Sequence, residues 1–261
     1  MIVTLGDLLL DVIVRLSQPL AEGADADAVT RLGPGGQAAN VAAWIAELGG
    51  DARFVGKTGD DEAGRIARAA LERYGVEVVG PVEGRTGTVV SLVGEDGSRT
   101  MASDRGVSPD LRVDDVDLGW FEDQDLHLPA YSLVREPIAS AALAAAAVAE
   151  TVVVDLSSWS AIRDYGPDRF RALLEELEPD YIFANEDEAR ILDGPWDGRW
   201  IVKRGPRGAR FGFDVELPAR RAAVVDTTGA GDALAAGWWV GGAKLAMRTA
   251  ARCVAQLGSM P

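Results

Sequence analysis

Residues 226–232, with the sequence DTTGAGD, combine a backbone that can hold a phosphate with a side chain that can take a proton. A strand-like run ends at Val225, and Gly229, Ala230 and Gly231 then open a helix rich in small residues. Their N–H groups can converge on an anion, and the helix dipole favours negative charge there. The Asp232 carboxylate beside this cradle can accept the proton of an attacking hydroxyl. The alternative is that Asp232 stabilises the helix start and the glycines form a tight turn.

Two common nucleotide-binding loops are absent from the sequence. It contains no G-x-x-x-x-G-K-[ST] motif, and no G-x-G-x-x-G follows a strand near the N-terminus. A nucleotide-dependent dehydrogenase, with the glycines holding a pyrophosphate, is an alternative that therefore lacks its expected motif.

The elements that must position these residues alternate between strands and helices. Strands are expected at 1–14 (a first strand with a turn at Gly6), 51–59, 125–133, 151–157 and 180–186. Helices are expected at 35–50, 60–75, 136–150 and 167–178, with two small-residue-rich helices in 229–257. This order predicts an α/β fold, with a mostly parallel central sheet covered by helices on both faces. Ligands in such folds bind beyond the carboxyl ends of the strands.

A second, smaller sheet is expected outside this core. Segment 85–102 contains two β-rich runs around Glu95, Asp96 and Gly97, which is a hairpin pattern. With the polar excursion at 15–34, it predicts a β-rich lid, formed from about 15–34 and 85–106 and inserted in a single domain spanning 1–261.

The motif at 226–232 closely resembles the carboxyl-terminal signature of ribokinase-like (PfkB) sugar and nucleoside kinases. The sequence GGQAANVAAWIAELGG, which starts at Gly35, resembles the family's amino-terminal glycine-rich motif, with Asn40 in the place of the substrate-gripping Asn. The two motifs occur in the family's order, and the resemblance covers nearly the whole chain. It implies ATP-dependent transfer of the γ-phosphoryl group to a hydroxyl of a sugar, sugar acid or nucleoside. A non-catalytic sugar- or nucleoside-binding sensor on the same fold is the alternative.

The resemblance assigns roles at the catalytic and acceptor sites. Asp232 is the expected base, and Gly229, Ala230 and Gly231 form the expected anion hole. The expected substrate-binding residues are Asp11 on the first strand, Gly35, Gly36, Asn40 and Arg105. The planar fork of Arg105 suits a carboxylate or a cluster of hydroxyls, although the residue could equally be an ordinary surface arginine.

The resemblance also assigns a nucleotide site. Its expected members are Asn185, Glu188, Lys203, Gly205, Gly208 and Thr228. Glu188 would bind Mg²⁺ through water, and Asp226 and Thr227 match positions that hold a monovalent cation, such as K⁺, in many members. Two alternatives stay open: Asn185 could simply cap a helix, and Lys203 could be a solvated charge rather than a phosphate ligand.

The overall charge and the rare residue types limit the partners and the location. The formal net charge of −15 disfavours nucleic acid and anionic membranes as partners. The one cysteine, Cys253, is expected to be a buried structural thiol, and the one histidine, His127, a core residue. The acidic, non-basic N-terminal segment is not typical of a signal peptide, so a cytoplasmic location is expected.

The chain also departs from the family pattern. Typical members continue beyond the final GSMP, and Met247 stands where many have Asn or His near the nucleotide. These differences concern the choice of nucleotide more than the reaction. Lid hairpins in the family often pair between subunits, which implies a homodimer through the lid.

Overall fold

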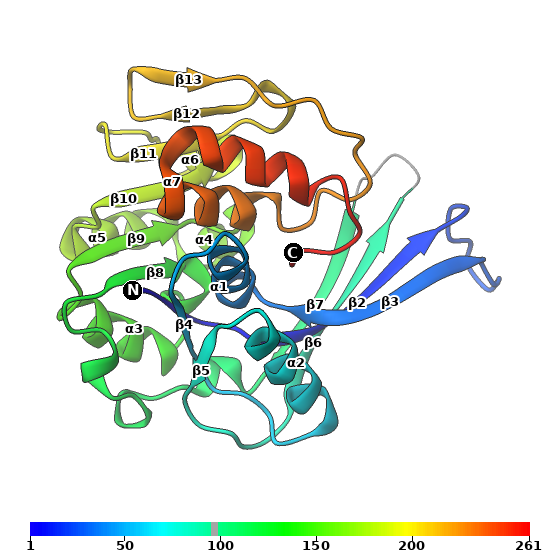
Figure 1. Cartoon of the computed structure of the whole chain (residues 1–261), viewed down its shortest axis with the longest axis horizontal. Coiled ribbons are helices and arrows are strands. Elements are labelled where there is room, and N and C mark those ends of the chain that lie inside the picture. Colours follow the sequence, from blue (N-terminus) through cyan, green and yellow to red (C-terminus); the bar gives the residue numbers. More distant parts are fainter. Residues whose placement is uncertain (95–98) are drawn as a thin grey trace.

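The computed structural model describes residues 1–94 and 99–261, and over these residues the main element is a nine-stranded sheet (Figure 1). In spatial order its strands are β13 (Val215–Leu217), β12 (Ala209–Phe211), β11 (Trp200–Lys203), β10 (Tyr181–Asn185), β9 (Thr151–Asp155), β8 (Asp125–Pro129), β1 (Ile2–Leu5), β4 (Ala52–Val55) and β5 (Glu77–Val79). All neighbours from β11 to β5 are parallel, and only β12 and β13 are antiparallel additions. The expected α/β fold is confirmed.

Helices cover both faces of this sheet. One face carries α1 (Gln37–Glu47), α2 (Glu62–Arg73) and α7 (Ala230–Cys253). The other carries α3 (Ile138–Ala146), α4 (Trp159–Tyr165), α5 (Pro167–Leu177) and α6 (Glu186–Ile191). α7 contains non-helical backbone at Gly241 and Gly242, which agrees with the two helices expected at 229–257.

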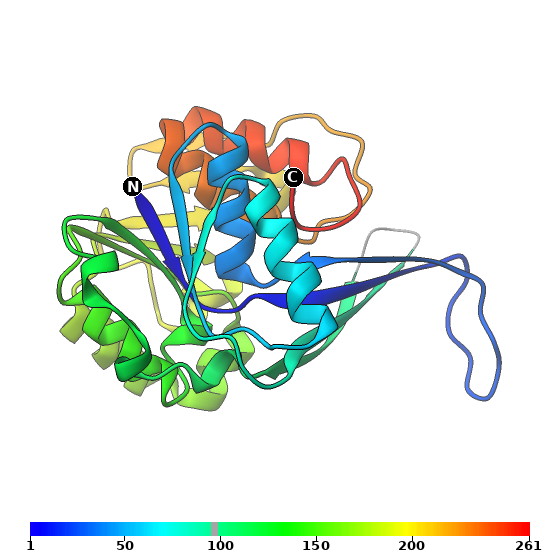
Figure 2. The same cartoon turned by 60° about the horizontal axis from the view of Figure 1, so that its bottom comes forward.

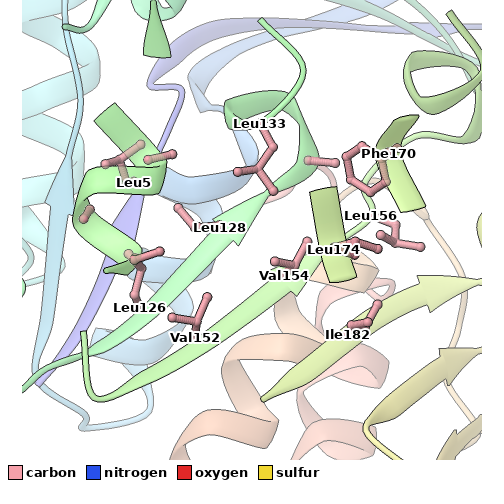
Figure 3. Close-up of a cluster of buried hydrophobic side chains, with 14 of the residues drawn as sticks. Leu5, Leu126, Leu128, Leu133, Val152, Val154, Leu156, Phe170, Leu174 and Ile182 are labelled. Carbon is pink, nitrogen blue, oxygen red and sulfur yellow. The ribbon is translucent and has the colours of Figure 1, made fainter. Parts of the chain in front are cut away.

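Successive side chains along a core strand belong alternately to two buried clusters, one on each face of the sheet. This explains why the strands are apolar throughout. Val152 and Val154 on β9 belong to the cluster beneath α3, α4 and α5, whereas Val153 belongs to the cluster beneath α1 and α7. Figure 3 shows the first cluster, with Leu174 among the side chains that pack on the sheet. A sheet buried on both faces favours apolar residues within its strands, so polar side chains at the strand ends are candidates for a site.

The lid is a separate four-stranded sheet that projects from the core (Figures 1 and 2). Its strands lie in the order β3 (Ala28–Gly35), β2 (Leu9–Leu16), β6 (Thr86–Val93) and β7 (Arg99–Gly106). β2 and β6 are parallel to each other, and the two outer strands are antiparallel to their neighbours. The expected turn at residues 95–97 lies outside the described residues.

The expectation of one strand over 1–14 is wrong. β1 ends at Leu5 and enters the core sheet, and β2 begins at Leu9 and enters the lid. Gly6 allows this change of sheet, because a Cβ at this position would lie 2.9 Å from the Ser132 hydroxyl. The lid therefore begins at Leu9 rather than near residue 15, and Asp11 lies on a lid strand. Within the described part of the chain, no helix has the length and apolar character needed to cross a membrane.

Candidate active site

The turn before α7 is held in shape by the carboxylate of Asp226, which is completely buried. One of its oxygens accepts hydrogen bonds from the backbone N–H and the hydroxyl of Thr228, at 2.8 and 2.6 Å. The other accepts a hydrogen bond from the Gly258 N–H at 3.0 Å. Gly229 then adopts a left-handed conformation with φ of 75°, and a Cβ there would lie 2.7 Å from Ser259. The predicted anion cradle is therefore a fixed turn and not a mobile loop.

Asp232 lies in the first turn of α7, just beyond this cradle, and Asn40 contacts it from α1. The Asn40 side chain donates a hydrogen bond of 2.7 Å to the Asp232 carboxylate. The Ser259 hydroxyl donates in turn to the Asn40 side-chain oxygen at 3.0 Å. The two residues that the resemblance assigns to the base and the substrate grip thus contact each other, although 192 positions separate them in sequence.

Asp11 faces the same end of the site. Its carboxylate lies 3.5 Å from the Ser259 hydroxyl and is almost fully buried. Burial raises the pKa of Asp11 to about 7; the Ser259 hydrogen bond lowers it and the nearby Asp226 carboxylate raises it further. Asp11 is therefore a buried carboxyl group in the cavity wall that a bound ligand could reach.

The two glycines expected to contact substrate have packing roles as well. A Cβ at Gly35 would collide with the Asp11 carboxylate, and one at Gly36 would collide with the Asp7 backbone. Gly36 has φ of 101° and lines the cavity, whereas Gly35 is not among the cavity-lining residues. Glycine at these two positions allows the end of β3 to pass close to Asp7 and Asp11.

Arg105 lies at the base of β7 and points into the site, so it is not an ordinary surface arginine. Its guanidinium forms an ion pair with Asp7 and lies 3.6 Å from the centre of the Tyr131 ring. Its side chain is only 14% exposed. The charge of Arg105 is thus largely balanced by Asp7, while its side chain remains in the wall of the cavity, near Asp11 and the lid.

Two of the residues expected at the nucleotide site, Asn185 and Lys203, lie at the carboxyl ends of the neighbouring strands β10 and β11. Asn185 and Glu188 form a reciprocal cap at the start of α6, in which Glu188 accepts from the Asn185 backbone and side chain at 2.7 and 2.8 Å. The helix-capping alternative is therefore correct as a structural role, and it leaves Glu188 facing the cavity. Burial raises the pKa of Glu188, while Lys203 opposes that effect.

Lys203 is not a solvated charge. Its ammonium lies 2.9 and 2.8 Å from the two oxygens of Asp155, a fully buried residue at the end of β9. Burial alone would lower the pKa of Lys203, but the surrounding carboxylates, Asp155 and Glu188 foremost, raise it above its ordinary value. Lys203 is therefore a largely buried cation in the cavity wall, paired with Asp155.

These residues surround one cavity of about 760 Å³. The sequence-predicted residues in its wall are Asp11, Gly36, Asn40, Arg105, Asn185, Glu188, Lys203, Gly205, Gly208, Thr227, Thr228, Gly229, Ala230, Gly231 and Asp232. Met247 also lies in the wall, with Ala250 and Ala251 of α7 and Val254 just beyond its end. Apart from Asp226 and Gly35, which are not among the cavity-lining residues, the structure brings the predicted site together.

Sequence analysis missed several residues of this cavity. Asp155, Ser157, Gln37, Ser103, Tyr131, Arg220 and Arg221 line it as well. Of these residues, Asp155 could have been predicted from the sequence, because it is an acidic residue at the end of the very apolar run TVVVD. The buried Gln37 side-chain oxygen has no hydrogen-bond partner within the described residues, so it is available to a ligand.

The residues expected to be structural are buried. His127 is fully buried, its Nδ1 accepts a hydrogen bond from the Trp239 indole at 3.4 Å, and burial lowers its pKa to about 4. The Cys253 thiol is buried and donates to the Thr228 carbonyl at 3.3 Å. Both expectations are confirmed.

Comparison with known proteins identifies the family of the chain. The model of the pfkB family of carbohydrate kinases matches residues 1–260. An ATP-dependent ribose-1-phosphate kinase of Halopiger xanaduensis is 34% identical over 254 residues, which cover 87% of this chain and 80% of that protein. Fructokinase-1 of Oryza sativa is 31% identical, with 89% of this chain and 80% of that protein covered.

Solved structures give the same result for the fold. An adenosine kinase from Sinorhizobium meliloti has a TM-score of 0.86 and 25% identity, with 100% of this chain and 95% of that chain covered. A sugar kinase from Pyrococcus horikoshii in complex with ATP has a TM-score of 0.84 and 23% identity, with 99% and 94% covered. The expected enzyme class, a phosphotransferase, is confirmed, and the dehydrogenase alternative is not supported. The chain belongs to the PfkB family of carbohydrate kinases.

Proposed function

We propose that this kinase transfers the γ-phosphoryl group of ATP to a hydroxyl of a sugar, sugar acid or nucleoside, with Asp232 as the base. The observation that carries the proposal is the position of Asp232, between the anion cradle of residues 229–231 and the acceptor-facing side chains of Asn40 and Asp11. A hydroxyl bound at that end would have a carboxylate within reach and a fixed turn of N–H groups beyond it.

The residues of the site have distinct tasks in this reaction. Asn40 orients the Asp232 carboxylate through its hydrogen bond, and the backbone N–H groups of residues 229–231 stabilise the charge that develops on the phosphoryl group. Closure of the lid over the acceptor would exclude water and limit wasteful ATP hydrolysis.

A magnesium ion fits the oxygen-rich nucleotide side of the cavity. Glu188 and Asn185 would hold it through water, because both Glu188 oxygens already accept hydrogen bonds from Asn185. Bound Mg²⁺ would neutralise charge on the phosphates. A monovalent cation at Asp226 and Thr227 stays a prediction, as do the cytoplasmic location and the exclusion of nucleic acid and membrane as partners.

We also propose that two copies associate through the lid. The supporting observation is that the outer lid strand β3 leaves Val29 and Leu32 62% and 63% exposed. Large apolar side chains on an edge strand are suited to association with a second chain.

The function is tested by coupled ADP release with ATP and Mg²⁺ across a panel of sugars, sugar acids, sugar phosphates and nucleosides. Release above the acceptor-free background with one class supports the proposal and identifies the acceptor. Silence across the panel, with thermal-shift evidence that a panel compound binds, would contradict turnover and favour the sensor alternative.

A further inference from the structure

Asp155 and Lys203 form an ion pair that crosses the end of a strand. β10 lies between β9, which ends at Asp155, and β11, which ends at Lys203. The Lys203 ammonium lies 2.9 and 2.8 Å from the two carboxylate oxygens. The Asp155 side chain is inaccessible to solvent and that of Lys203 is 15% exposed. Such burial removes much hydration from two charges, so the pair is weak evidence for a purely stabilising role.

The backbone after Asp155 is shaped to hold its carboxylate. The Ser157 N–H donates to one carboxylate oxygen at 3.0 Å, and the Ser157 hydroxyl donates to the Asp155 carbonyl at 2.8 Å. The same hydroxyl accepts a hydrogen bond from the Ala130 N–H at 3.1 Å. Ser157 has φ of 64°, a conformation that residues other than glycine rarely adopt. A strained residue beside a cavity is a frequent sign of a functional constraint.

The Lys203 ammonium lies against the anion cradle. A Cβ placed on Gly231 would be 3.2 Å from Lys203 Nζ, so the ammonium is directly beneath the first turn of α7. An ammonium group has three hydrogens, and the two Asp155 oxygens account for two of them. The third can be donated toward the cavity, which both residues line.

We propose that Asp155 is a positioning residue for phosphoryl transfer, which fixes the Lys203 ammonium beneath Gly231 so that it meets the terminal phosphate of the nucleotide. This inference rests on the proposed function and adds to it a residue outside the predicted site. Asp155 itself touches neither reactant; it acts through Lys203.

The charges around Lys203 predict how pH reports this role. Asp155 from β9, Glu188 from α6 and Asp232 from α7 all raise the pKa of Lys203, against the lowering effect of burial. His127 from β8 also lies near the pair, and burial, which lowers its pKa to about 4, keeps it neutral at working pH. Replacing Asp155 with Asn removes the largest raising contribution, so Lys203 would lose its proton at lower pH.

The test compares Asp155→Asn with the same change at Asp180, whose carboxylate accepts from the Val152 N–H at the opposite end of β9. We expect Asp155→Asn to lower kcat by roughly 10- to 100-fold and to move the alkaline limb of the kcat profile to lower pH. Asp180→Asn should change neither. In the double variant with Lys203→Met, Asp155→Asn should add less than about 3-fold to the loss caused by Lys203→Met alone, because the two residues act as a unit.

A binding measurement separates this inference from the proposed function. Calorimetry with a non-hydrolysable ATP analogue and with ADP gives the affinity that the terminal phosphate adds. That increment should shrink about 10-fold in Asp155→Asn and stay unchanged in Asp180→Asn, even if no acceptor is found. An unchanged increment, an unmoved alkaline limb or full additivity with Lys203→Met would overturn the proposal. A large rise in the Mg²⁺ concentration needed for half-maximal rate, with an unmoved limb, would instead make Asp155 a metal ligand.

Discussion

The two ends of the cavity are built in different ways. At the expected nucleotide end, Asp155 and Lys203 end the core strands β9 and β11, and Glu188 lies in the first turn of α6. Asp155 and Lys203 form a buried ion pair, and the charge of Glu188 acts on Lys203. At the acceptor end, Asp11 and Arg105 lie on lid strands that project from the core. Under the proposed function, we expect the core end to govern phosphoryl transfer and the lid end to govern the choice of acceptor. Changes at the core end should affect kcat for every acceptor, and changes at the lid end should affect KM for some.

Replacing Lys203 with Met should cause the largest loss after that of the base. We expect kcat to fall roughly 10²- to 10³-fold for each accepted substrate, because a fixed donor to the developing charge is lost. The matched control is Lys244→Met on the exposed part of α7. A loss that differs more than about 10-fold between acceptors would break the division between the two ends.

The Asn40 side chain contacts Asp232 and also faces the expected acceptor, so its removal should change both kcat and the acceptor KM. Asn40→Ala deletes the 2.7 Å hydrogen bond to Asp232 and a polar contact for the acceptor. We expect kcat to fall roughly 10- to 100-fold and the acceptor KM to rise, with the ATP KM nearly constant. A change in the ATP KM alone would place Asn40 at the wrong end of the cavity.

Asp11→Asn should act on the acceptor alone. The amide keeps the shape but loses one acceptor of hydrogen bonds and gains a donor, so we expect the acceptor KM to rise about 10-fold with little change in kcat. Steady-state kinetics with varied acceptor and saturating ATP measures this. A fall of about 10-fold in kcat with an unchanged acceptor KM would instead show that Asp11 acts in the phosphoryl-transfer step.

The same variant should change the dependence of stability on pH. The pKa of Asp11 is raised by burial to about 7, so its protonated form is favoured in the folded state and the folded state loses stability as pH rises toward 7. Asp11→Asn removes this loss, so the variant should melt at a higher temperature than the unmodified chain near pH 8. The expected rise in Tm is roughly 2–4 °C for each kcal/mol of unfolding free energy that is recovered. The difference should shrink near pH 4. Thermal melts across that range would contradict the assignment if the difference were constant.

The smallest effect on the reaction is expected at the outer edge of the lid. Leu32→Asp places a charge on an exposed position of β3 and should disrupt the proposed dimer while leaving kcat within about 3-fold. Light scattering at working concentration measures the outcome. A protein that is already a monomer without the substitution would refute association through the lid.

The sequence predicted the parts of the site that are contiguous in the chain. Residues 226–232 hold both the cradle and the expected base, and their resemblance to the family motif supplied the expected chemistry. The Asp155–Lys203 pair was not predicted, because it depends on which strands become neighbours: β9 and β11 are separated by β10 in the sheet and by 44 residues or more in the chain. The division of residues 1–14 between two sheets was also missed, because an apolar pattern does not tell which sheet a strand joins.

The contribution of Ser259 could not be predicted for the same reason. Its hydroxyl contacts Asn40 and lies near Asp11, residues that are 219 and 248 positions away in the sequence. Only the packing of the last residues against α1 and the base of the lid creates that contact.

The most direct test of the central claim is phosphoryl transfer by Asp232→Asn. Formation of ADP and of phosphorylated acceptor, followed together by phosphorus NMR, should fall by roughly 10²- to 10⁴-fold in kcat, while the ATP analogue still binds with nearly normal affinity. Full activity of Asp232→Asn on the accepted substrate would contradict the account, because no proton acceptor would then be needed at this position.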